Sequence, residues 1–257
     1  MSTQLKVMSF NMRLHCPTDG LNVFTNRRER ILAFLNETCA DVIGFQEVTP
    51  AMRDWLVESL PAYYTVGGGR GVNYDDEASL IAFRKDVFSL ISCDSIMLSN
   101  TPRVFGSRYD GSDQSDCPRV YTRAFLKHRD IAEPFYVYNV HTDHIGQVSR
   151  MLASVQLLQD ITSHDRTFFM TGDFNALPGA PEIQAITACK TRGIVDATAE
   201  LGGTFHDFGR REVLEKIDYV FTDASVKILE AVRVNDTPAE GTPYISDHYP
   251  VYIVAEL

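Results

Sequence analysis

The sequence predicts an α/β protein, because strand-like and helix-like patterns alternate along its whole length of 257 residues. Apolar residues make up 44% of the chain and charged residues 23%, a balance that provides a sizeable hydrophobic core. Repeats, low-complexity segments and linkers do not interrupt the pattern. Length alone allows either one large domain or two small ones.

The chain is expected to open with a strand, a helix and a second strand. Apolar runs at residues 5–12 and 41–48 are typical of buried strands. Between them, residues 27–38 carry apolar side chains at helical spacing, and Thr25 or Asn26 would be the N-cap of this helix. This order is the beginning of a strand–helix–strand unit.

The middle of the chain predicts one more helix and then mainly strands. Residues 49–60 predict a helix, because a threonine N-cap precedes a proline at the first helical position. Residues 63–98 are rich in strand-like patterns. Residues 120–128 and 135–143 predict two paired strands joined by a turn at residues 133–134.

The last part of the chain alternates again. Residues 146–163 predict a helix with an apolar stripe that we expect to face the core, formed by Val148, Met151, Leu152, Val155 and Leu158. The segment FFMTGDFNALP, residues 168–178, predicts a buried strand that ends on an acid and an amide, and a short helix follows from about Ala180. Late strands are expected at residues 216–223, 226–234 and 249–257. Residues 106–118 are polar and predict a mobile loop over one face.

The net charge of −10, from 24 basic and 34 acidic residues, bears on the partner. Proteins that bind long nucleic acids usually carry a basic stripe that displaces counterions. The densest basic run here, residues 26–30, is expected to form the solvated face of a helix. The charge therefore disfavours duplex DNA, while a small phosphate ester remains compatible with it.

Cysteine usage and hydropathy predict a soluble cytoplasmic protein. The five cysteines are scattered, and their spacing matches neither a zinc finger nor a CxxC motif, so free thiols in a reducing compartment are expected. The first 13 residues lack the pattern of a signal peptide. Apolar runs stay well short of the roughly 20 residues that span a membrane.

Polar residues of the kinds used in catalysis stand at the ends of several expected strands. They are Asn11, Glu47, His141, Asp173, Asn175, Asp218, Asp247 and His248. Ligands of α/β proteins bind where strands end. A single buried acid at such a place is more often a cap or a turn residue, so the recurrence of these residues is what indicates a site.

This set of residues favours metal-assisted hydrolysis of a phosphate ester. It contains carboxylates, amides and histidines, without a GxSxG serine or a GxxxxGK[ST] phosphate loop. Oxygen ligands of this kind suit Mg²⁺ or Mn²⁺ better than Zn²⁺. Cleavage of a phosphate ester needs a cation to offset charge, a carboxylate to activate water and donors to hold the transition state.

The segment HTDH, residues 141–144, has a second interpretation. H-x-D-H is part of the two-zinc motif of metallo-β-lactamase-type hydrolases, in which a further histidine stands two positions before the first. That position is Asn139 here, and three other histidines follow downstream. The zinc interpretation is therefore disfavoured.

Six short motifs occur in the order and context of a known family. They are SFNMR, GFQEV, NVHTDH, GDFNALP, KIDYVF and SDHYPV, within residues 7–254. On these motifs the chain resembles the endonuclease/exonuclease/phosphatase superfamily, also called deoxyribonuclease-I-like. The resemblance implies a four-layer α/β/β/α sandwich of two packed mixed β-sheets with outer helices, as a single domain over residues 1–257. Strand and helix patterns alone do not imply the two sheets.

The resemblance also implies a cation and the residues around it. Glu47 looks like the main ligand of a divalent cation, Mg²⁺ or Mn²⁺, with Asn11 beside it. Asp247 would contact this cation or a second one. Asp173 resembles the base or water-orienting acid of the family, and Asn175 resembles a donor to the scissile phosphate.

Two histidines complete the implied catalytic set. His248 resembles the histidine that stabilises the transition state, and Asp218 would orient it and keep it protonated, because an adjacent carboxylate favours imidazolium. His141 resembles the second catalytic histidine, and Glu77 stands where some members place its partner acid. Arg13 and Arg119 are expected phosphate contacts, although such arginines are more often surface charge. Supporting or structural roles are expected for Asp143, His144, Arg150 and Thr204.

The resemblance leaves the substrate open, because the superfamily includes nucleases, inositol polyphosphate phosphatases, sphingomyelinases and deadenylase-like enzymes. NVHTDH and GTFHDF look more like bacterial and deadenylase-like members than apurinic endonucleases. The net charge of −10 favours a small or single-stranded phosphoester over duplex DNA. A sequence-independent nuclease on DNA or RNA is the alternative enzyme, and a catalytically silent binding or scaffold module is the alternative class. We expect a monomer without appended recognition modules.

Overall fold

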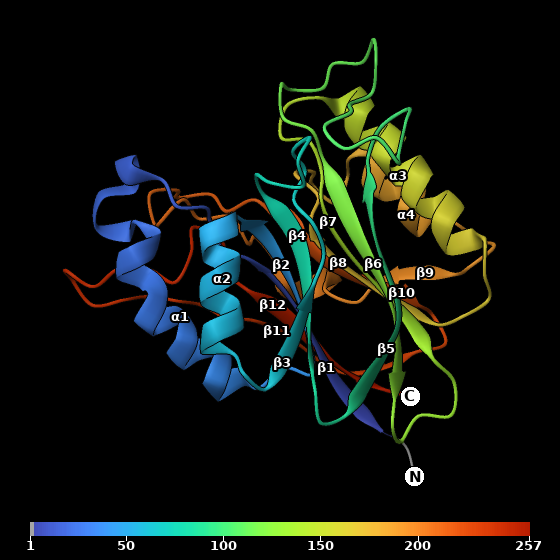
Figure 1. The fold of residues 1–257 in the computed structure, drawn as a ribbon, viewed down its shortest axis with the longest axis horizontal. Coiled ribbons are helices and arrows are strands. Elements are labelled where there is room, and N and C mark those ends of the chain that lie inside the picture. Colours follow the sequence, from blue (N-terminus) through green and yellow to red (C-terminus); the bar gives the residue numbers. More distant parts are fainter. Residues whose placement is uncertain (1–2) are drawn as a thin grey trace.

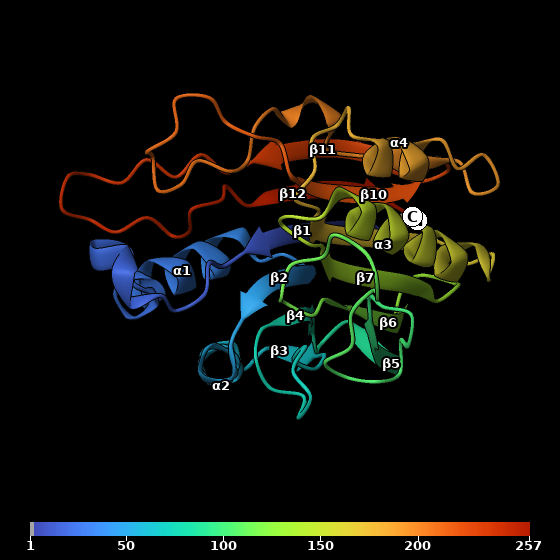
Figure 2. The ribbon, with the colours of Figure 1, turned by 90° about the horizontal axis from the view of Figure 1, so that it is seen from above.

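Two mixed β-sheets pack face to face and carry helices on their outer faces (Figures 1 and 2). The computed structural model describes residues 3–257, and residues 1–2, which open the segment tested for a signal peptide, lie outside this range. The four-layer sandwich that the family resemblance implied is thereby confirmed.

Each sheet has six strands. The first contains β1 (Gln4–Asn11), β2 (Val42–Val48), β3 (Tyr63–Val66), β4 (Ala78–Arg84), β11 (Lys227–Arg233) and β12 (Val251–Glu256). The second contains β5 (Phe88–Met97), β6 (Val120–His128), β7 (Phe135–His141), β8 (Phe168–Asp173), β9 (Ile194–Asp196) and β10 (Asp218–Asp223). The helices are α1 (Phe24–Thr38), α2 (Pro50–Ser59), α3 (Gln147–Thr162) and α4 (Pro181–Thr187), with 3-10 turns at Pro17–Asn22 and Ala199–Leu201.

The strand order places two strand–helix–strand units opposite each other. The sheets run β11-β12-β1-β2-β4-β3 and β5-β6-β7-β8-β10-β9, and the pairs β1–β2 and β7–β8 are parallel. Parallel neighbours need a crossover, which α1 and α3 provide. Helices α1 and α2 cover the first sheet, and α3 and α4 cover the second (Figure 2). Because β1 packs against β8 and β2 against β7, four strands end at the same edge of the sandwich.

A buried amide joins the two sheets. Asn139 on β7 donates from Nδ2 to the carbonyls of Phe45 and Leu80 in the first sheet, at 2.8 Å each. The sheets approach this closely because Gly44 lacks a side chain. A Cβ at Gly44 would lie 2.0 Å from Thr171 Oγ1 and 2.5 Å from Asn139 Oδ1. The position at which a two-zinc motif would need a histidine is thus occupied by a structural amide.

Most of the expected elements are confirmed within about two residues. Helix α2 begins at Pro50 behind Thr49, and β6 and β7 form the expected antiparallel pair. The start of α1 differs from the prediction. Its first helical residue is Phe24, because the preceding 3-10 turn leads directly into it, so Thr25 and Asn26 lie inside the first turn and do not cap the helix.

Three of the five residues in the apolar stripe predicted on α3 do not face the core, whereas Leu158 packs against it as expected. Val148, Leu152 and Val155 are 56%, 38% and 42% exposed. The buried face of α3 consists of Ser149, Ala153, Ser154, Leu157 and Ile161. Helix α3 lies close to α4, and this packing outweighed the hydrophobicity of the exposed face.

The basic run at residues 26–30 is not wholly solvated as predicted. Arg27 is fully buried, and its guanidinium donates to the carbonyls of Met12, Arg13 and Ile245 at 2.6–2.7 Å. These carbonyls belong to the segments that follow β1 and precede β12. Arg27 therefore ties two loops together directly behind the shared strand edge.

The polar segment at residues 106–118 contains no helix or strand, as expected, and rises as a green loop at the top of Figure 1. Two buried contacts hold it to the second sheet and its helix. The Ser115 hydroxyl donates to the Asp143 carboxylate, and the Tyr109 hydroxyl donates to Gln156 of α3 at 2.7 Å. The loop is therefore anchored beside the end of β7.

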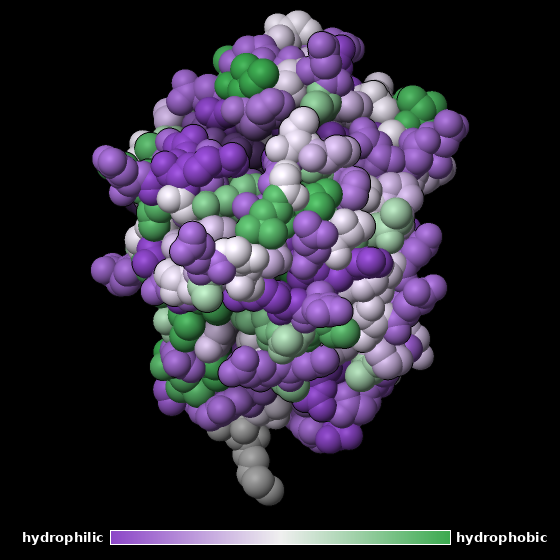
Figure 3. Space-filling model, turned by 90° about the vertical axis from the view of Figure 1, so that its left-hand side faces the viewer, coloured by the Kyte–Doolittle hydropathy of each residue, from purple (hydrophilic) through white to green (hydrophobic). Residues whose placement is uncertain are grey.

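The outer face over α1 and α2 mixes hydrophilic residues with small, separate hydrophobic groups (Figure 3). Such a surface suits a layer that faces water. All five cysteines are free thiols, as expected. Among residues 3–257, no helix combines the length and the apolar character needed to cross a membrane.

Candidate active site

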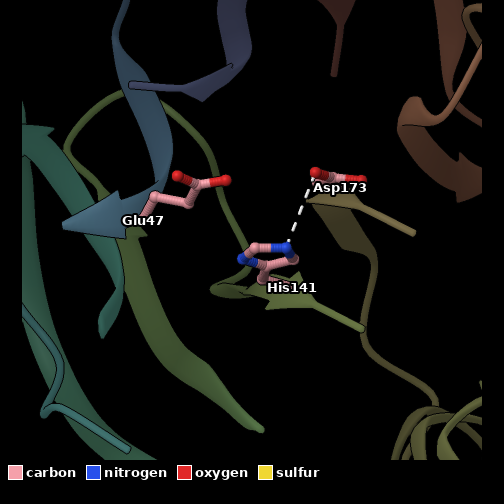
Figure 4. A group of neighbouring side chains, drawn as sticks. All are labelled: Glu47, His141 and Asp173. Carbon is pink, nitrogen blue, oxygen red and sulfur yellow. Dashed lines mark ion pairs between the residues drawn. The ribbon is translucent and has the colours of Figure 1, made fainter. Parts of the chain in front are cut away.

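Three of the predicted side chains lie in one row across the second sheet. His141 ends β7, Asp173 ends β8 and Asp218 begins β10. The strand register pairs His141 with Asp173, and Asp173 with Asp218. His141 Nε2 lies 3.6 Å from Asp173 Oδ2, as Figure 4 shows. All three are buried, so each charge depends on its neighbours.

Asn11 and Glu47 reach the same place from the first sheet. Asn11 ends β1, and Glu47 lies in a bulge of β2, between Phe45 and Val48, with a left-handed φ of 59°. The bulge turns the Glu47 carboxylate toward Asp173 (Figure 4). Asn11 Nδ2 donates to Glu47 Oε1 at 3.1 Å and to Asp173 Oδ2 at 2.9 Å. One amide thus holds acids from both sheets together.

His248, just before β12, forms a buried pair with Asp218. Its Nδ1 lies 2.8 Å from Asp218 Oδ2, and the Thr204 hydroxyl donates to the same oxygen at 2.5 Å. Burial alone would lower the pKa of His248, but the charge and hydrogen bond of Asp218 outweigh it and raise the pKa to about 10. His248 is therefore an imidazolium at neutral pH, and its Nε2 lies 3.9 Å from Asp173 Oδ2.

Asp173 and His141 have pKa values shifted in opposite directions. Burial, followed by the charge of Asp218, raises the pKa of Asp173 to about 7. Burial also lowers the pKa of His141 well below its usual value, and the charges of Arg119 and Arg70 lower it further. An aspartate that titrates near neutral pH is thus flanked by a neutral imidazole and by an imidazolium.

Several buried acids lie close together in the site, and this fits a divalent metal ion. Burial above all raises the pKa of Glu77 to about 7 and that of Asp247 to about 6, and the charge of Glu47 adds to both shifts. Donor atoms of Glu47, His141 and Asp173 all lie within 4.8 Å of one another. Clustered carboxylate oxygens are what Mg²⁺ and Mn²⁺ prefer.

Asn175 follows β8 in a left-handed conformation, with φ of 47°. Its backbone N–H donates to Asp173 Oδ1 at 2.9 Å, which leaves Oδ2 of that acid facing the other groups of the site. Its side-chain amide donates to the Thr142 carbonyl at 3.1 Å. Strained backbone of this kind concentrates at functional sites, and Asn175 shares it with Glu47.

Arg13 also faces the site, but its charge is already paired. Its guanidinium forms two hydrogen bonds to Asp19, both at 3.0 Å, and its Nε lies 3.6 Å from Asp247 Oδ2. Its backbone N–H donates to Asn11 Oδ1 at 2.9 Å. As a result Asn11 directs its amide nitrogen, and not its oxygen, toward the acids.

The second half of the HTDH segment builds the wall of the site. Asp143 accepts hydrogen bonds from Ser115 and from the N–H of Gly146, and so connects the 106–118 loop to the start of α3. His144 Nδ1 lies 2.8 Å from Arg119 Nη2. In the described part of the chain, neither Asp143 nor His144 belongs to a group of metal-binding donors, which argues against the two-zinc interpretation.

A cavity of about 490 Å³ connects these residues. Every predicted site residue lines it except Asn11 and Asp218, which lie behind the lining and hold Glu47 and His248. The structure therefore brings the whole predicted set to one place, from eight separate segments of the chain. Arg150 and Thr204, predicted to be structural, lie outside the lining, and Arg150 pairs with Glu182 at 2.7 Å.

Comparison with known proteins assigns the family. The profile of the Endonuclease/Exonuclease/phosphatase family matches residues 8–248. The chain belongs to this family. The resemblance seen in its sequence motifs is thereby confirmed. Among proteins with curated functions, none matches the chain.

Solved structures of bacterial members of the family share the fold over almost their entire length. An endonuclease/exonuclease/phosphatase from Bacteroides vulgatus is 29% identical, with a TM-score of 0.92 over 99% of each chain. A family protein from Bacteroides thetaiotaomicron is 25% identical, with a TM-score of 0.91 over 100% of this chain and 99% of that one. A mannosyl-6-phosphatase from the same organism is 25% identical, with a TM-score of 0.88 over 98% and 99%.

Three further side chains that the sequence analysis did not single out also line the cavity of this family member, and one of them, Phe205, lies within the GTFHDF segment. Arg70, in the loop before β4, donates from Nη2 to Glu77 at 2.6 Å. The Phe205 ring lies 4.8 Å from the His248 ring, centroid to centroid. Arg211 lies over the Phe205 ring at 4.4 Å. These residues come from loops, whose approach to the site depends on tertiary structure.

Proposed function

We propose that this chain is a divalent-metal-dependent hydrolase that cleaves a small phosphoester with an activated water molecule. The observation that carries the proposal is the set of side chains that lie close to the Asp173 carboxylate. Its Oδ2 lies 3.6 Å from His141 Nε2 and 3.9 Å from His248 Nε2, and Asn11 holds it next to Glu47. A candidate base, two imidazole side chains and a carboxylate that could bind a metal ion thus lie next to one another.

Glu47 and Asp247 would hold Mg²⁺ or Mn²⁺, with Asn11 beside Glu47. Burial above all, and then the charge of Glu47, raises the pKa of Asp247, and a bound cation would offset this charge. When bound, the cation neutralises charge on the phosphoryl and leaving oxygens.

The remaining chemistry belongs to side chains of the chain itself. Asp173 takes a proton from the attacking water, whose oxygen bonds to phosphorus as the ester P–O bond breaks, and the leaving oxygen takes a proton from solvent. A pKa of about 7 suits this base. His248, kept charged by Asp218, and Asn175 donate hydrogen bonds to phosphoryl oxygens as negative charge develops on them. His141 is neutral, so it serves as a hydrogen-bonding group beside Asp173.

Three observations support a small substrate. A cavity of about 490 Å³ is in the usual range for small-molecule sites. The net charge of −10 opposes binding of a long polyanion. The mannosyl-6-phosphatase, 25% identical over nearly the full length of both chains, acts on a phosphorylated sugar according to its name.

The test is turnover on a panel of phosphomonoesters, phosphodiesters, oligonucleotides, inositol phosphates and sphingomyelin, with Mg²⁺, with Mn²⁺ and with EDTA. We expect metal-dependent cleavage of small esters, and a fall in kcat of roughly 10²-fold or more in Asp173→Asn and in His248→Asn. Asp223→Asn and His128→Asn are matched controls, because both residues are buried and lie outside the cavity.

Three outcomes would overturn the proposal or its substrate. Absence of metal-dependent turnover on every substrate would favour a binding or scaffold protein. Full activity in both Asp173→Asn and His248→Asn would show that the catalytic site lies elsewhere. Preferential, steeply salt-dependent cleavage of duplex DNA would replace the small substrate by a nucleic acid.

A further inference from the structure

One end of the cavity narrows into a recess between two buried arginines. This arginine recess is lined by Arg70, Arg119, Glu77 and His141, and closed behind by buried residues of β4 and β6. Its free volume is about 10 Å³, the space of a single water oxygen. The recess and the wider cavity share both arginines, Glu77 and His141, as well as Glu47, so the two are continuous.

Arg119 brings to the recess a buried guanidinium whose hydrogen-bonding capacity is not filled. It is 4% exposed, and its Nη2 is hydrogen-bonded to the His144 ring and not to an acid. The pKa of His144 is lowered by burial and by Arg119, so the ring is a neutral acceptor. Within residues 3–257, Arg119 Nε has no hydrogen-bond partner. Asp143 lies 3.6 Å from Nε and balances its charge, but this distance is too long for a hydrogen bond, and the Asp143 oxygens accept hydrogen bonds from Ser115 and from backbone N–H groups instead.

Arg70 adds donors to the recess and little net charge. Its Nη2 donates to Glu77 Oε1 at 2.6 Å, and its Nε donates to Asp76 at 3.2 Å. Glu77 therefore balances Arg70, and Glu47 is the expected cation ligand. What remains is the guanidinium of Arg119, which has no hydrogen bond to an acid and whose buried donors an anionic oxygen would satisfy.

We propose that the recess receives an unesterified oxygen of a terminal phosphoryl group, which makes this hydrolase selective for phosphomonoesters. The inference rests on the proposed function and names its substrate class. A monoester carries a charge near −2 and three unesterified oxygens. A diester carries −1 and has two unesterified oxygens, so it cannot supply one to the recess, one to the cation and one to the donors His248 and Asn175 at once, whereas a monoester can.

The first test compares p-nitrophenyl phosphate with bis(p-nitrophenyl) phosphate in the presence of Mn²⁺. The wild type should prefer the monoester. Arg119→Met should lower kcat/KM for the monoester by roughly 10²-fold and for the diester by less than about 5-fold, and Arg119→Lys should recover part of the loss. Arg123→Met is the matched control: Arg123 lies on β6, the strand that Arg119 directly precedes, pairs with Asp94 and Asp160, and should keep the wild-type ratio. Equal losses on both esters in Arg119→Met would overturn the inference.

A binding experiment separates failure of this inference from failure of the proposed function. Calorimetry with inorganic phosphate and with dimethyl phosphate, in the presence of Mg²⁺, requires no turnover. We expect inorganic phosphate to bind the wild type and Arg123→Met alike, and to bind Arg119→Met at least about 10-fold more weakly. Equal binding of phosphate to wild type and Arg119→Met would overturn the proposed role of the recess, even if the protein hydrolyses esters. Preference of the wild type for dimethyl phosphate would overturn it as well. If Arg119→Met melts early, Arg119→Lys takes its place in both tests.

Discussion

The Asp218–His248 pair allows a prediction that can be worked out in numbers. Asp218→Asn removes the charge 2.8 Å from His248 Nδ1 and changes the shape of the side chain little. An opposite charge at this distance raises a histidine pKa by ~1–3 units, or about 1.4–4 kcal/mol at 1.36 kcal/mol per unit. The full rise of the His248 pKa, from 6.5 to about 10, includes contributions of Asp173 and Asp247. We therefore expect Asp218→Asn to lower the pKa of His248 by ~1–3 units.

Histidine-detected NMR on chelator-treated protein measures this pKa directly, since the chain has seven histidines to resolve. Asp223→Asn is the matched control. Asp223 lies at the other end of β10, is buried and pairs with Arg192 at 2.8 Å, so its loss should leave the pKa of His248 unchanged. If His248 titrated at the same pH in Asp218→Asn as in the wild type, the pair would not hold the proton, and the reasoning would be refuted.

The same shift gives a pH dependence of stability with a definite sign. The folded pKa of His248 lies above its unfolded value of 6.5, so protonation favours the folded chain. This stabilisation is complete below pH 6.5 and is lost as the pH rises from 6.5 through about 10. Urea unfolding of the chelator-treated protein should therefore show Asp218→Asn less stable than the wild type at pH 6.5, with a difference that shrinks toward pH 10. A constant difference would contradict this sign.

Three other perturbations test separate parts of the structure. Mn²⁺ at about 100 times its Kd should stabilise the wild type by about 2.7 kcal/mol and raise its Tm by roughly 5–10 °C, and Glu47→Gln should lose most of this shift. Gly172→Ala should lower the free energy of unfolding in urea by ~1–3 kcal/mol, because its Cβ would lie 2.5 Å from the Val140 carbonyl oxygen; an unchanged midpoint would contradict this. Arg27→Met leaves four carbonyls without their donor and should cost ~3 kcal/mol or more in the same assay, whereas the exposed control Arg28→Met should stay within about 0.5 kcal/mol.

The site could be predicted largely because its residues stand at strand ends. Asn11, Glu47, His141 and Asp173 each close an apolar run that is visible in the sequence, and such runs are local signals. Their meeting at one edge depends on which strands pair, and that was implied by the family motifs and not by periodicity. The bulge that turns Glu47 inward left no local signal, because it arises from the register of β2 against β4.

Other features were missed because tertiary contacts outweighed local patterns. Arg27 is spaced four and eight residues from the buried Ile31 and Leu35, so its position on the core face was visible, but its charge favoured a solvated interpretation. On α3 the exposed stripe is more hydrophobic than the buried face, and close packing decided the orientation. Arg70 follows three glycines, of which Gly69 permits a tight loop, since a Cβ there would lie 2.1 Å from the carbonyl oxygen of Asp75.

The central claim is that a divalent cation and Asp173 together hydrolyse a small phosphoester in this cavity. Its most direct test is turnover of p-nitrophenyl phosphate and bis(p-nitrophenyl) phosphate by chelator-treated protein, before and after addition of Mn²⁺, in the wild type and in Asp173→Asn. The account predicts no turnover before Mn²⁺, turnover after it in the wild type, and a loss of roughly 10²-fold or more in Asp173→Asn. Turnover that persists without a cation, or that Asp173→Asn retains in full, would contradict it.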